Sequence, residues 1–160
     1  MNTWDGKERR VRHNVAIRKL VIRAKEKYKN FFEDHYKYSY DEPVEELGLD
    51  KELIDQLLED YVAQVIKSTY QFKNYIDNIA SKKESDVDYL KEFHELAHKN
   101  LGVARNLRVK DAEKVLKDMM NHNDLEVLKS CNLALKSSAI LLKPECAYNT
   151  MKLIEVKNKL

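Results

Sequence analysis

The sequence predicts an all-α protein, and three observations lead to this prediction. The chain of 160 residues has only three glycines and two prolines, the residues that most often interrupt a helix. Apolar side chains recur every three or four residues along most of the chain, which is the spacing of one helical face. Hydrophobic residues make up 43% of the sequence, enough for one buried core. We therefore expect one helical domain with an appendage.

The first expected helix covers residues from about 8 to 36. Its apolar and aromatic side chains fall on one face: Ile17, Leu20, Val21, Ala24, Tyr28, Phe31 and Phe32. Pro43 disfavours a helical conformation in the residue before it, so this helix should give way to a linker that runs to about Asp50. Residues 1–46 are thus predicted to be a basic helix and a linker.

Two longer helices are expected next. Asp50 is a suitable N-cap for a helix that ends near Ile79, because its carboxylate can accept a hydrogen bond from a free backbone N–H group. The polar residues 81–86 separate this helix from another that begins near Ser85. That third helix should bury Leu90, Phe93, Ala97, Leu101 and Ala104.

Two further helices, over about 109–120 and 124–142, are separated by the polar segment 121–124. Pro144 interrupts the second of them, because proline breaks the pattern of backbone hydrogen bonds. A short terminal helix over 146–158 is compatible with the sequence that follows.

The connections between these helices predict the architecture. Four helices joined by about two to eight residues favour antiparallel neighbours. We predict an antiparallel up-and-down four-helix bundle over residues 47–143, with the additional N-terminal helix of residues 1–46. Residues 144–160 are expected to form a C-terminal tail or a short helix.

Basic residues are concentrated near the N-terminus. Residues 1–29 contain ten Lys and Arg against three Asp and Glu, although the whole chain has a formal charge of only +2. The apolar stripe of the first helix can pack on the bundle and leave a solvated cationic face, which would neutralise the acidic stretch from Asp41 to Asp60. The alternative is that the basic helix binds nucleic acid or an anionic membrane surface. We favour the structural role.

The sequence predicts a cytoplasmic protein without a membrane span. No apolar run approaches the ~20 residues that cross a bilayer, and the charged N-terminus lacks an apolar segment of the signal-peptide type. Cys131 and Cys146 are too few for a disulfide framework and match no zinc-knuckle spacing. Buried thiols in a reducing compartment are the expected state.

Residues 93–102 admit two chemical interpretations that share His98. In the first, His94 and His98 are zinc ligands one helical turn apart, and Glu95 is the general base of a metallopeptidase. Such a site needs a third protein ligand. The extended zinc-peptidase motif has histidine at the position of Ala104, and no strand is predicted that would align a peptide substrate. This interpretation is the less favoured one.

In the second interpretation His98 is an exposed nucleophile. Each helical residue turns about 100°, so His98 lies about 100° from Ala97 in the buried stripe. Lys91 and Arg105 lie about two turns away on either side, on the same face. Gly102 lies one turn further along, although a glycine inside a helix costs about 1 kcal/mol relative to alanine. This glycine either leaves room for a bulky partner to reach the imidazole or allows close packing between helices.

The segment around His98 resembles the signature of histidine-containing phosphotransfer (HPt) domains. In that signature an alanine and the phosphorylated histidine are followed by two residues, a lysine and a glycine. The corresponding residues here are Ala97-His98-Lys99-Asn100-Leu101-Gly102. The resemblance extends from about Leu47 to Leu142, because the long helix before the histidine helix and the two helices after it follow in the same order.

The resemblance implies that His98 carries a phosphoryl group between the aspartates of receiver domains in a two-component phosphorelay. The residues implied to lie near the phosphoryl group are Gly102, Arg105 and Lys91. Those implied to dock the partner are Ala97 and Leu101. The partners would be a response-regulator receiver domain, a hybrid histidine kinase, or both. The chain itself would need no cofactor, because the magnesium is expected on the receiver domain.

Two positions depart from the family pattern. Leu101 stands where the family has its lysine, and Arg108 stands where it has a later glycine. Without that glycine, Asn106 is the expected left-handed residue in the turn to the next helix. These departures leave a second function open, a phosphotransfer-deficient module that docks receiver or kinase domains. In either case the protein would be a carrier or a docking module rather than a turnover enzyme.

Overall fold

The described chain is entirely helical, and the predicted all-α class is confirmed. The computed structural model describes residues 3–32, 37–82 and 87–159, and these contain seven helices and no strand. The helices are α1 (Thr3–Phe31), α2 (Asp41–Leu47), α3 (Lys51–Ala80), α4 (Tyr89–Leu107), α5 (Lys110–Asn121), α6 (Leu125–Leu142) and α7 (Pro144–Lys159). None of these helices is both long enough and apolar enough to cross a membrane.

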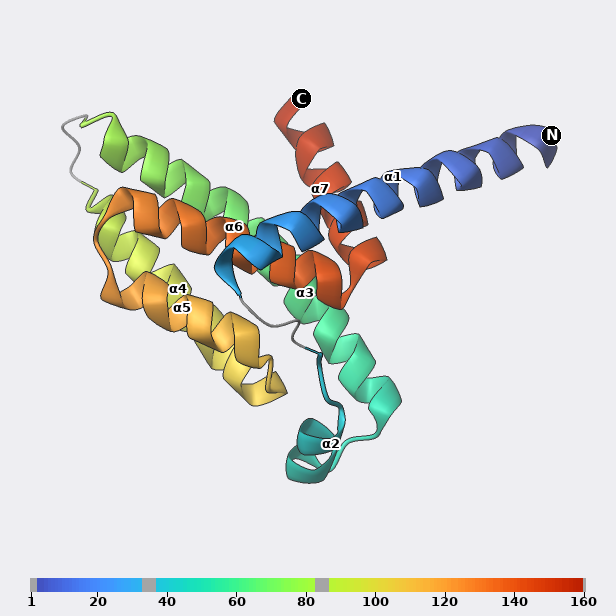
Figure 1. Ribbon diagram of the computed structural model, residues 1–160, viewed down its shortest axis with the longest axis horizontal. Coiled ribbons are helices and arrows are strands. Elements are labelled where there is room, and N and C mark those ends of the chain that lie inside the picture. Colours follow the sequence, from blue (N-terminus) through green and yellow to red (C-terminus); the bar gives the residue numbers. More distant parts are fainter. Residues whose placement is uncertain (1–2, 33–36, 83–86, 160) are drawn as a thin grey trace.

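The helices α3 to α6 pack against one another, and α1 and α7 are added to them. α4 packs against α3 and α5, and α6 packs against α5 and α3. α1 lies across α6 and also contacts α7, which packs on α3 and α6 (Figure 1). The N-terminal half of α1 extends beyond the other helices (Figure 1).

One buried cluster runs through all of these helices except the short α2. Its largest fully buried side chains include Phe72 of α3 and Phe93 of α4, whose ring centroids lie 4.6 Å apart. Ala24 of α1 and Ala147 of α7 belong to the same cluster. The N-terminal and C-terminal helices therefore complete the core that the central helices begin.

Acidic N-caps explain where three of the helices begin. The carboxylates of Asp50, Asp88 and Asp124 accept hydrogen bonds from backbone N–H groups in the first turns of α3, α4 and α6. Each cap satisfies a donor that has no partner within the helix and places negative charge at the positive end of the helix dipole. The predicted cap at Asp50 is confirmed. α4 begins at Tyr89, and the predicted start near Ser85 lies outside the described residues.

The segment around Pro43 is helical, so the predicted linker is wrong. Pro43 is the third residue of α2, within the first turn, where a backbone N–H group has no partner in the helix and its loss costs little. Gly48 ends α2 with a φ of 64°, and its N–H group donates to the carbonyl of Val44. The predicted boundary after residue 46 therefore falls inside a helix.

The ends of the first and last helices also differ from the prediction. α1 begins at Thr3 and ends at Phe31, earlier at both ends than the predicted range of 8–36. Residues 33–36 lie outside the described part. Pro144 begins α7 rather than merely ending α6, because proline is well suited to the first position of a helix.

Candidate functional site

α4 places His98 on its outer face. The buried side of this helix carries Phe93, Ala97, Asn100, Leu101, Ala104 and Leu107. His98 follows Ala97 directly, turns about 100° away from it and is exposed. Among the described residues its imidazole has no hydrogen-bond or ion-pair partner. The exposure expected from the helical spacing is confirmed, and the ring is accessible to a reactant.

An open recess of about 520 Å³ borders His98. Its lining residues are Asp88, Leu90, Lys91, His94, Glu95, His98 and Asn123. The carboxylate of Asp88 is already engaged, since it accepts a hydrogen bond from the backbone N–H group of Lys91 at 3.1 Å. Lys91 brings positive charge to this recess and Glu95 brings negative charge. The recess therefore gives access to the imidazole, and its lining carries both positive and negative charge.

Gly102 leaves open space one turn from His98. A Cβ atom built on Gly102 meets no heavy atom within 4 Å, and the residue is exposed. Close packing between helices therefore does not explain this glycine. The cost of about 1 kcal/mol for glycine in a helix interior has no compensating contact within the described chain. Gly102 therefore leaves this part of the α4 surface without a side chain that could obstruct access to His98.

Lys91 and Arg105 share the face of α4 that carries His98. Both are exposed, and each is seven residues from His98, which corresponds to a rotation of about 20° around the helix. The same spacing gives a rise of about 10 Å, so their long side chains have to extend along the helix to reach an anion at His98. Neither side chain has an ion-pair partner in the described residues. Both cations are available to a ligand.

Ala97 and Leu101 were predicted to dock a partner, and this prediction is wrong. Their exposed fractions are 0% and 3%, because their spacing of four residues places both on the face of α4 that points to the core. An apolar residue at position 101 matches that environment. The side chains that can meet a partner are those around the outer face, with Gly102 and His98 at its centre.

His94 is held by contacts within the chain. Its Nε2 atom lies 3.2 Å from the carbonyl oxygen of His122, and its ring packs edge-on against Phe93. A hydrogen bond to a carbonyl requires the proton on Nε2, which leaves that nitrogen without a free lone pair for a metal. Within residues 3–32, 37–82 and 87–159, no group of three or more His, Cys, Asp and Glu is placed to hold a metal ion. The arrangement gives no support to the zinc interpretation of His94 and His98.

The turn after α4 contains its left-handed residue at position 108. Arg108 has φ 60° and ψ 40°, and the next residue, Val109, donates its N–H group to the carbonyl of Ala104 at 3.0 Å. Asn106, which was predicted to take this conformation, lies inside α4, because the helix continues to Leu107. That prediction is wrong. Position 108 is the place where the HPt pattern has glycine, the residue best suited to a positive φ.

The Arg108→Gly variant is expected to be about 1 kcal/mol more stable than Arg108→Ala. Both variants lose the ion pair that the Arg108 guanidinium forms with Glu46. They differ in the backbone, because a left-handed conformation costs a residue with a Cβ atom about 1 kcal/mol. Urea unfolding of the two variants measures this difference. Equal stabilities would contradict a left-handed conformation at this position.

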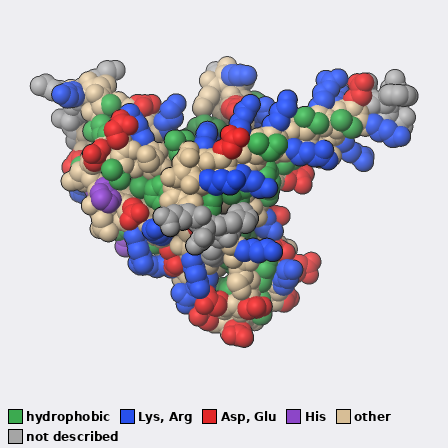
Figure 2. Space-filling view, viewed as in Figure 1, with side chains coloured by type: hydrophobic (Ala, Val, Ile, Leu, Met, Phe, Trp, Pro, Cys, Tyr) green, Lys and Arg blue, Asp and Glu red, His purple; other side chains and the backbone are tan. Residues whose placement is uncertain are grey.

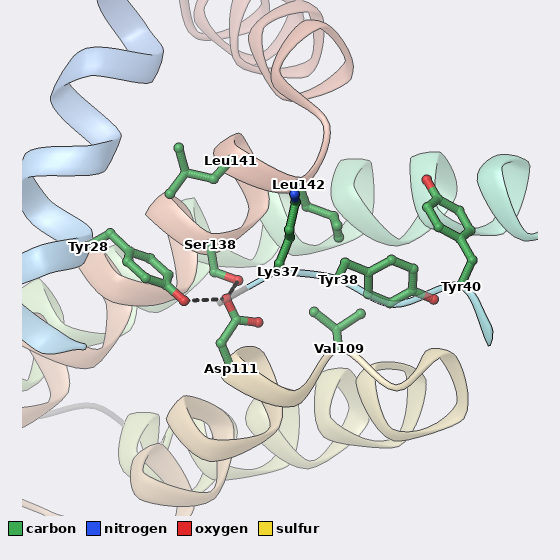
Figure 3. Close-up of a pocket in the computed structure, with 9 residues that line it drawn as sticks. All are labelled: Tyr28, Lys37, Tyr38, Tyr40, Val109, Asp111, Ser138, Leu141 and Leu142. Carbon is green, nitrogen blue, oxygen red and sulfur yellow. Dashed lines mark hydrogen bonds between the residues drawn. The ribbon is translucent and has the colours of Figure 1, made fainter. Parts of the chain in front are cut away.

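A buried carboxylate that the sequence did not single out lies where α1, α5 and α6 meet. Asp111 is 9% exposed, and its Oδ2 atom accepts hydrogen bonds from the Tyr28 hydroxyl at 3.1 Å and the Ser138 hydroxyl at 2.9 Å (Figure 3). A cavity of about 330 Å³ lies beside this group, lined by Tyr28, Lys37, Tyr38, Tyr40, Val109, Asp111, Ser138, Leu141 and Leu142 (Figure 3). The hydrogen bonds join residues of three helices, with Tyr28 lying 83 positions and Ser138 lying 27 positions from Asp111 in the sequence. Burial raises the pKa of Asp111, against the opposing effect of these hydrogen bonds.

The stability of the wild type relative to an Asp111→Asn variant is expected to rise as the pH falls. Because the folded-state pKa of Asp111 is raised above 3.8, the folded protein binds a proton more readily than the unfolded chain. The contribution of protonated Asp111 to the free energy of unfolding is fully present at a pH below the pKa that Asp111 has in the unfolded chain. It is lost as the pH rises through the higher pKa that Asp111 has in the folded protein. Urea unfolding of both proteins between acidic and neutral pH measures the trend. A relative loss of wild-type stability on acidification would contradict it.

Comparisons of this chain with protein-family models, with curated proteins and with solved structures find no match.

Proposed function

We propose that this protein is a histidine phosphotransfer protein of a two-component phosphorelay, with the phosphoryl group carried on His98. The observation that carries the proposal is the exposed imidazole, without a partner in the described residues, beside the open surface at Gly102. A neutral imidazole is a nucleophile when its nitrogen lone pair is free. The missing side chain at Gly102 lets the surface of another protein approach the ring.

The proposed transfer needs little from this chain beyond the nucleophile. A ring nitrogen of His98 attacks the phosphorus of an aspartyl phosphate, the P–N bond forms, and the P–O bond to the aspartate breaks to release its carboxylate. A second receiver aspartate then attacks the phosphorus, and the P–N bond breaks. Magnesium on the receiver and the side chains of Lys91 and Arg105 would offset the charge of the transferred group.

Two backbone features support the fold that this function requires. The contacts of α3 with α4 and α6, and of α5 with the same two helices, suit an antiparallel four-helix bundle of the HPt type. The left-handed residue Arg108 stands where the family pattern has its later glycine. Both features agree with the resemblance around His98, although Leu101 replaces the family lysine.

Chemical phosphorylation tests the proposal directly. The purified protein is incubated with phosphoramidate, a small donor that phosphorylates histidine, and separately with receiver domains charged by acetyl phosphate. We expect acid-labile, base-stable phosphate that peptide mass spectrometry places on His98. Phosphate that is found only on another histidine, such as the exposed His122, would overturn the assignment.

The second candidate is a docking module that binds receiver or kinase domains without transferring a phosphoryl group. It is favoured by Leu101, because this buried residue stands where the family pattern has the lysine that follows the histidine by three positions. Receiver binding measured by calorimetry, together with an absence of phosphate on His98, would select this function over the phosphorelay carrier.

A further inference from the structure

The basic helix α1 does not neutralise the acidic segment that follows it. The prediction that its cationic face neutralises Asp41–Asp60 is wrong, because α1 packs on α6 and α7 and no ion pair joins its Lys and Arg side chains to that segment in the described residues. Two glutamates of α2 pair instead with Arg108, in the turn after α4, and with Lys110, the first residue of α5. α1 lies across α6, and lysine and arginine side chains gather along it (Figure 2). In the part of the chain that the structure describes, Arg12 is the one Lys or Arg of α1 with an ion-pair partner, and that partner is Glu8 of the same helix.

Two cations of α1, Arg23 and Lys27, border a recess of about 200 Å³ where α1, α6 and α7 meet. Its polar lining residues are Arg23, Lys27, Lys136 and Ser137, and its other lining residues are Leu20, Ala24, Leu133, Ile140 and Met151. The Ser137 hydroxyl is already used, since it donates to the carbonyl of Leu133 at 2.8 Å. The groups that remain for a ligand are three cations, and no carboxylate lines the recess.

Lys136 of α6 lines this recess and is less exposed than Arg23 and Lys27. Its Nζ atom is 4.9 Å from the ring centroid of Tyr70, and its side chain is half-buried. Burial lowers the pKa of Lys136, and the positive charges of Lys27 and Lys73 act in the same direction. Glu155 opposes them, but its carboxylate also pairs with Lys152 at 3.7 Å. A bound anion would offset both the burial of this charge and the repulsion between the lysines.

The positive charge continues along α1 beyond the recess. Lys19, Arg23 and Lys27 follow one another at intervals of four residues, so they lie on one flank of the helix and span a rise of about 12 Å. All three are exposed. This length exceeds one phosphate group, so the row suits a ligand that carries several phosphates in succession.

An anionic membrane suits this surface less well. From residue 6 of α1 onward, the large apolar side chains that are exposed are Val11, Val15 and Ile22. They lie about 80–160° around the helix from Arg23 and Lys27, which border the recess, and about 40–80° from Lys19, so the recess faces away from most of this apolar surface. The recess is also concave and lies between helices. A flexible strand can place one phosphate in it while neighbouring phosphates follow the row.

We propose that the surface formed by Lys19, Arg23, Lys27 and Lys136 binds the phosphate backbone of a single-stranded nucleic acid. One phosphate occupies the recess between α1 and α6, and its neighbours pair with the cations along α1. Binding of this kind depends mainly on phosphate contacts, is strongly weakened by salt and has little sequence preference. This inference rests on a surface separate from His98 and does not depend on phosphotransfer.

Two triple variants with the same loss of charge test the proposal. Arg23→Gln/Lys27→Gln/Lys136→Gln removes the cations of the recess, and Arg18→Gln/Lys25→Gln/Lys29→Gln removes three exposed cations from the other flank of α1. The probe is a fluorescent oligouridine, and its anisotropy is titrated with each full-length protein over a series of potassium chloride concentrations. Circular dichroism melts establish that the variants are folded, and the exposed single change Arg23→Gln serves if the recess triple variant is not.

The wild type is expected to bind the probe with an affinity that falls linearly with salt on logarithmic axes. The recess variant should bind at least about tenfold more weakly, and its salt slope should be smaller by about 2, because three phosphate contacts are lost. The single change Arg23→Gln should weaken binding by about threefold and reduce the slope by about 0.7. The control variant should stay within about threefold of the wild type.

Three results would overturn the proposal. An equal loss of affinity in both triple variants would mean that binding reflects overall charge rather than this surface. Binding of the wild type to phosphatidylserine vesicles, with no affinity for the oligonucleotide, would assign the helix to a membrane. Stabilisation by inorganic phosphate, without oligonucleotide binding, would reduce the recess to a site for free phosphate.

Discussion

A His98→Gln variant is expected to carry no acid-labile phosphate above background after incubation with phosphoramidate or with charged receiver domains. Glutamine retains a polar side chain of similar size, but its amide nitrogen is not a nucleophile. Because His98 is exposed and without a partner in the described residues, its replacement should change the free energy of unfolding by less than about 0.5 kcal/mol. Radiolabelling at neutral pH and urea unfolding measure the two effects.

His122→Gln is the matched control for this variant. His122 is also exposed, and the contact that it makes with His94 uses its backbone carbonyl, which the substitution leaves in place. The control should therefore be labelled like the wild type. Label that survives in His98→Gln and disappears in His122→Gln would move the nucleophile to the connection between α5 and α6.

A Gly102→Trp variant is expected to lose at least about tenfold in the rate of phosphoryl transfer from a charged receiver domain. Nothing lies within 4 Å of a Cβ atom at this position, so the indole can project into solvent without disturbing the core. It would cover the approach to His98 and block a protein surface more than a small molecule. Labelling by phosphoramidate should therefore stay close to the wild-type rate, which separates lost docking from lost nucleophilicity.

Gly102→Ala provides the control for this position. Alanine removes the conformational cost of glycine and should raise the free energy of unfolding by about 1 kcal/mol, since its methyl group enters open space. Transfer from the receiver should fall less than in the tryptophan variant, because the methyl group covers little of the imidazole. A tryptophan variant that accepts phosphate from the receiver at the wild-type rate would show that no partner approaches over Gly102.

The features that the sequence predicted correctly depend on residues close together in the chain. The course of α3 after Asp50 follows from a cap and a repeating apolar stripe, and both signals lie within the helix itself. The exposure of His98 follows from its angle to Ala97, which helical geometry sets once α4 exists. The same local reasoning failed at Pro43, where a short helix is compatible with a proline in its first turn.

Contacts between distant residues account for what the sequence did not reveal about the sites. Tyr28, Asp111 and Ser138 meet only because α1 packs on α6 next to the start of α5, and nothing in their local sequences indicates a shared hydrogen-bond network. The recess that contains Arg23, Lys27 and Lys136 arises in the same way.

The sequence by itself determined the helical class, the periodic faces of the main helices and the outward direction of His98. These properties follow from backbone hydrogen bonding and side-chain spacing within a few turns. The tertiary structure decided that Gly102 faces open space and that the Lys and Arg side chains of α1 form no ion pair with another helix in the described chain. Those properties depend on which surfaces of distant helices meet, and burial and ion pairing exist only once the helices have packed.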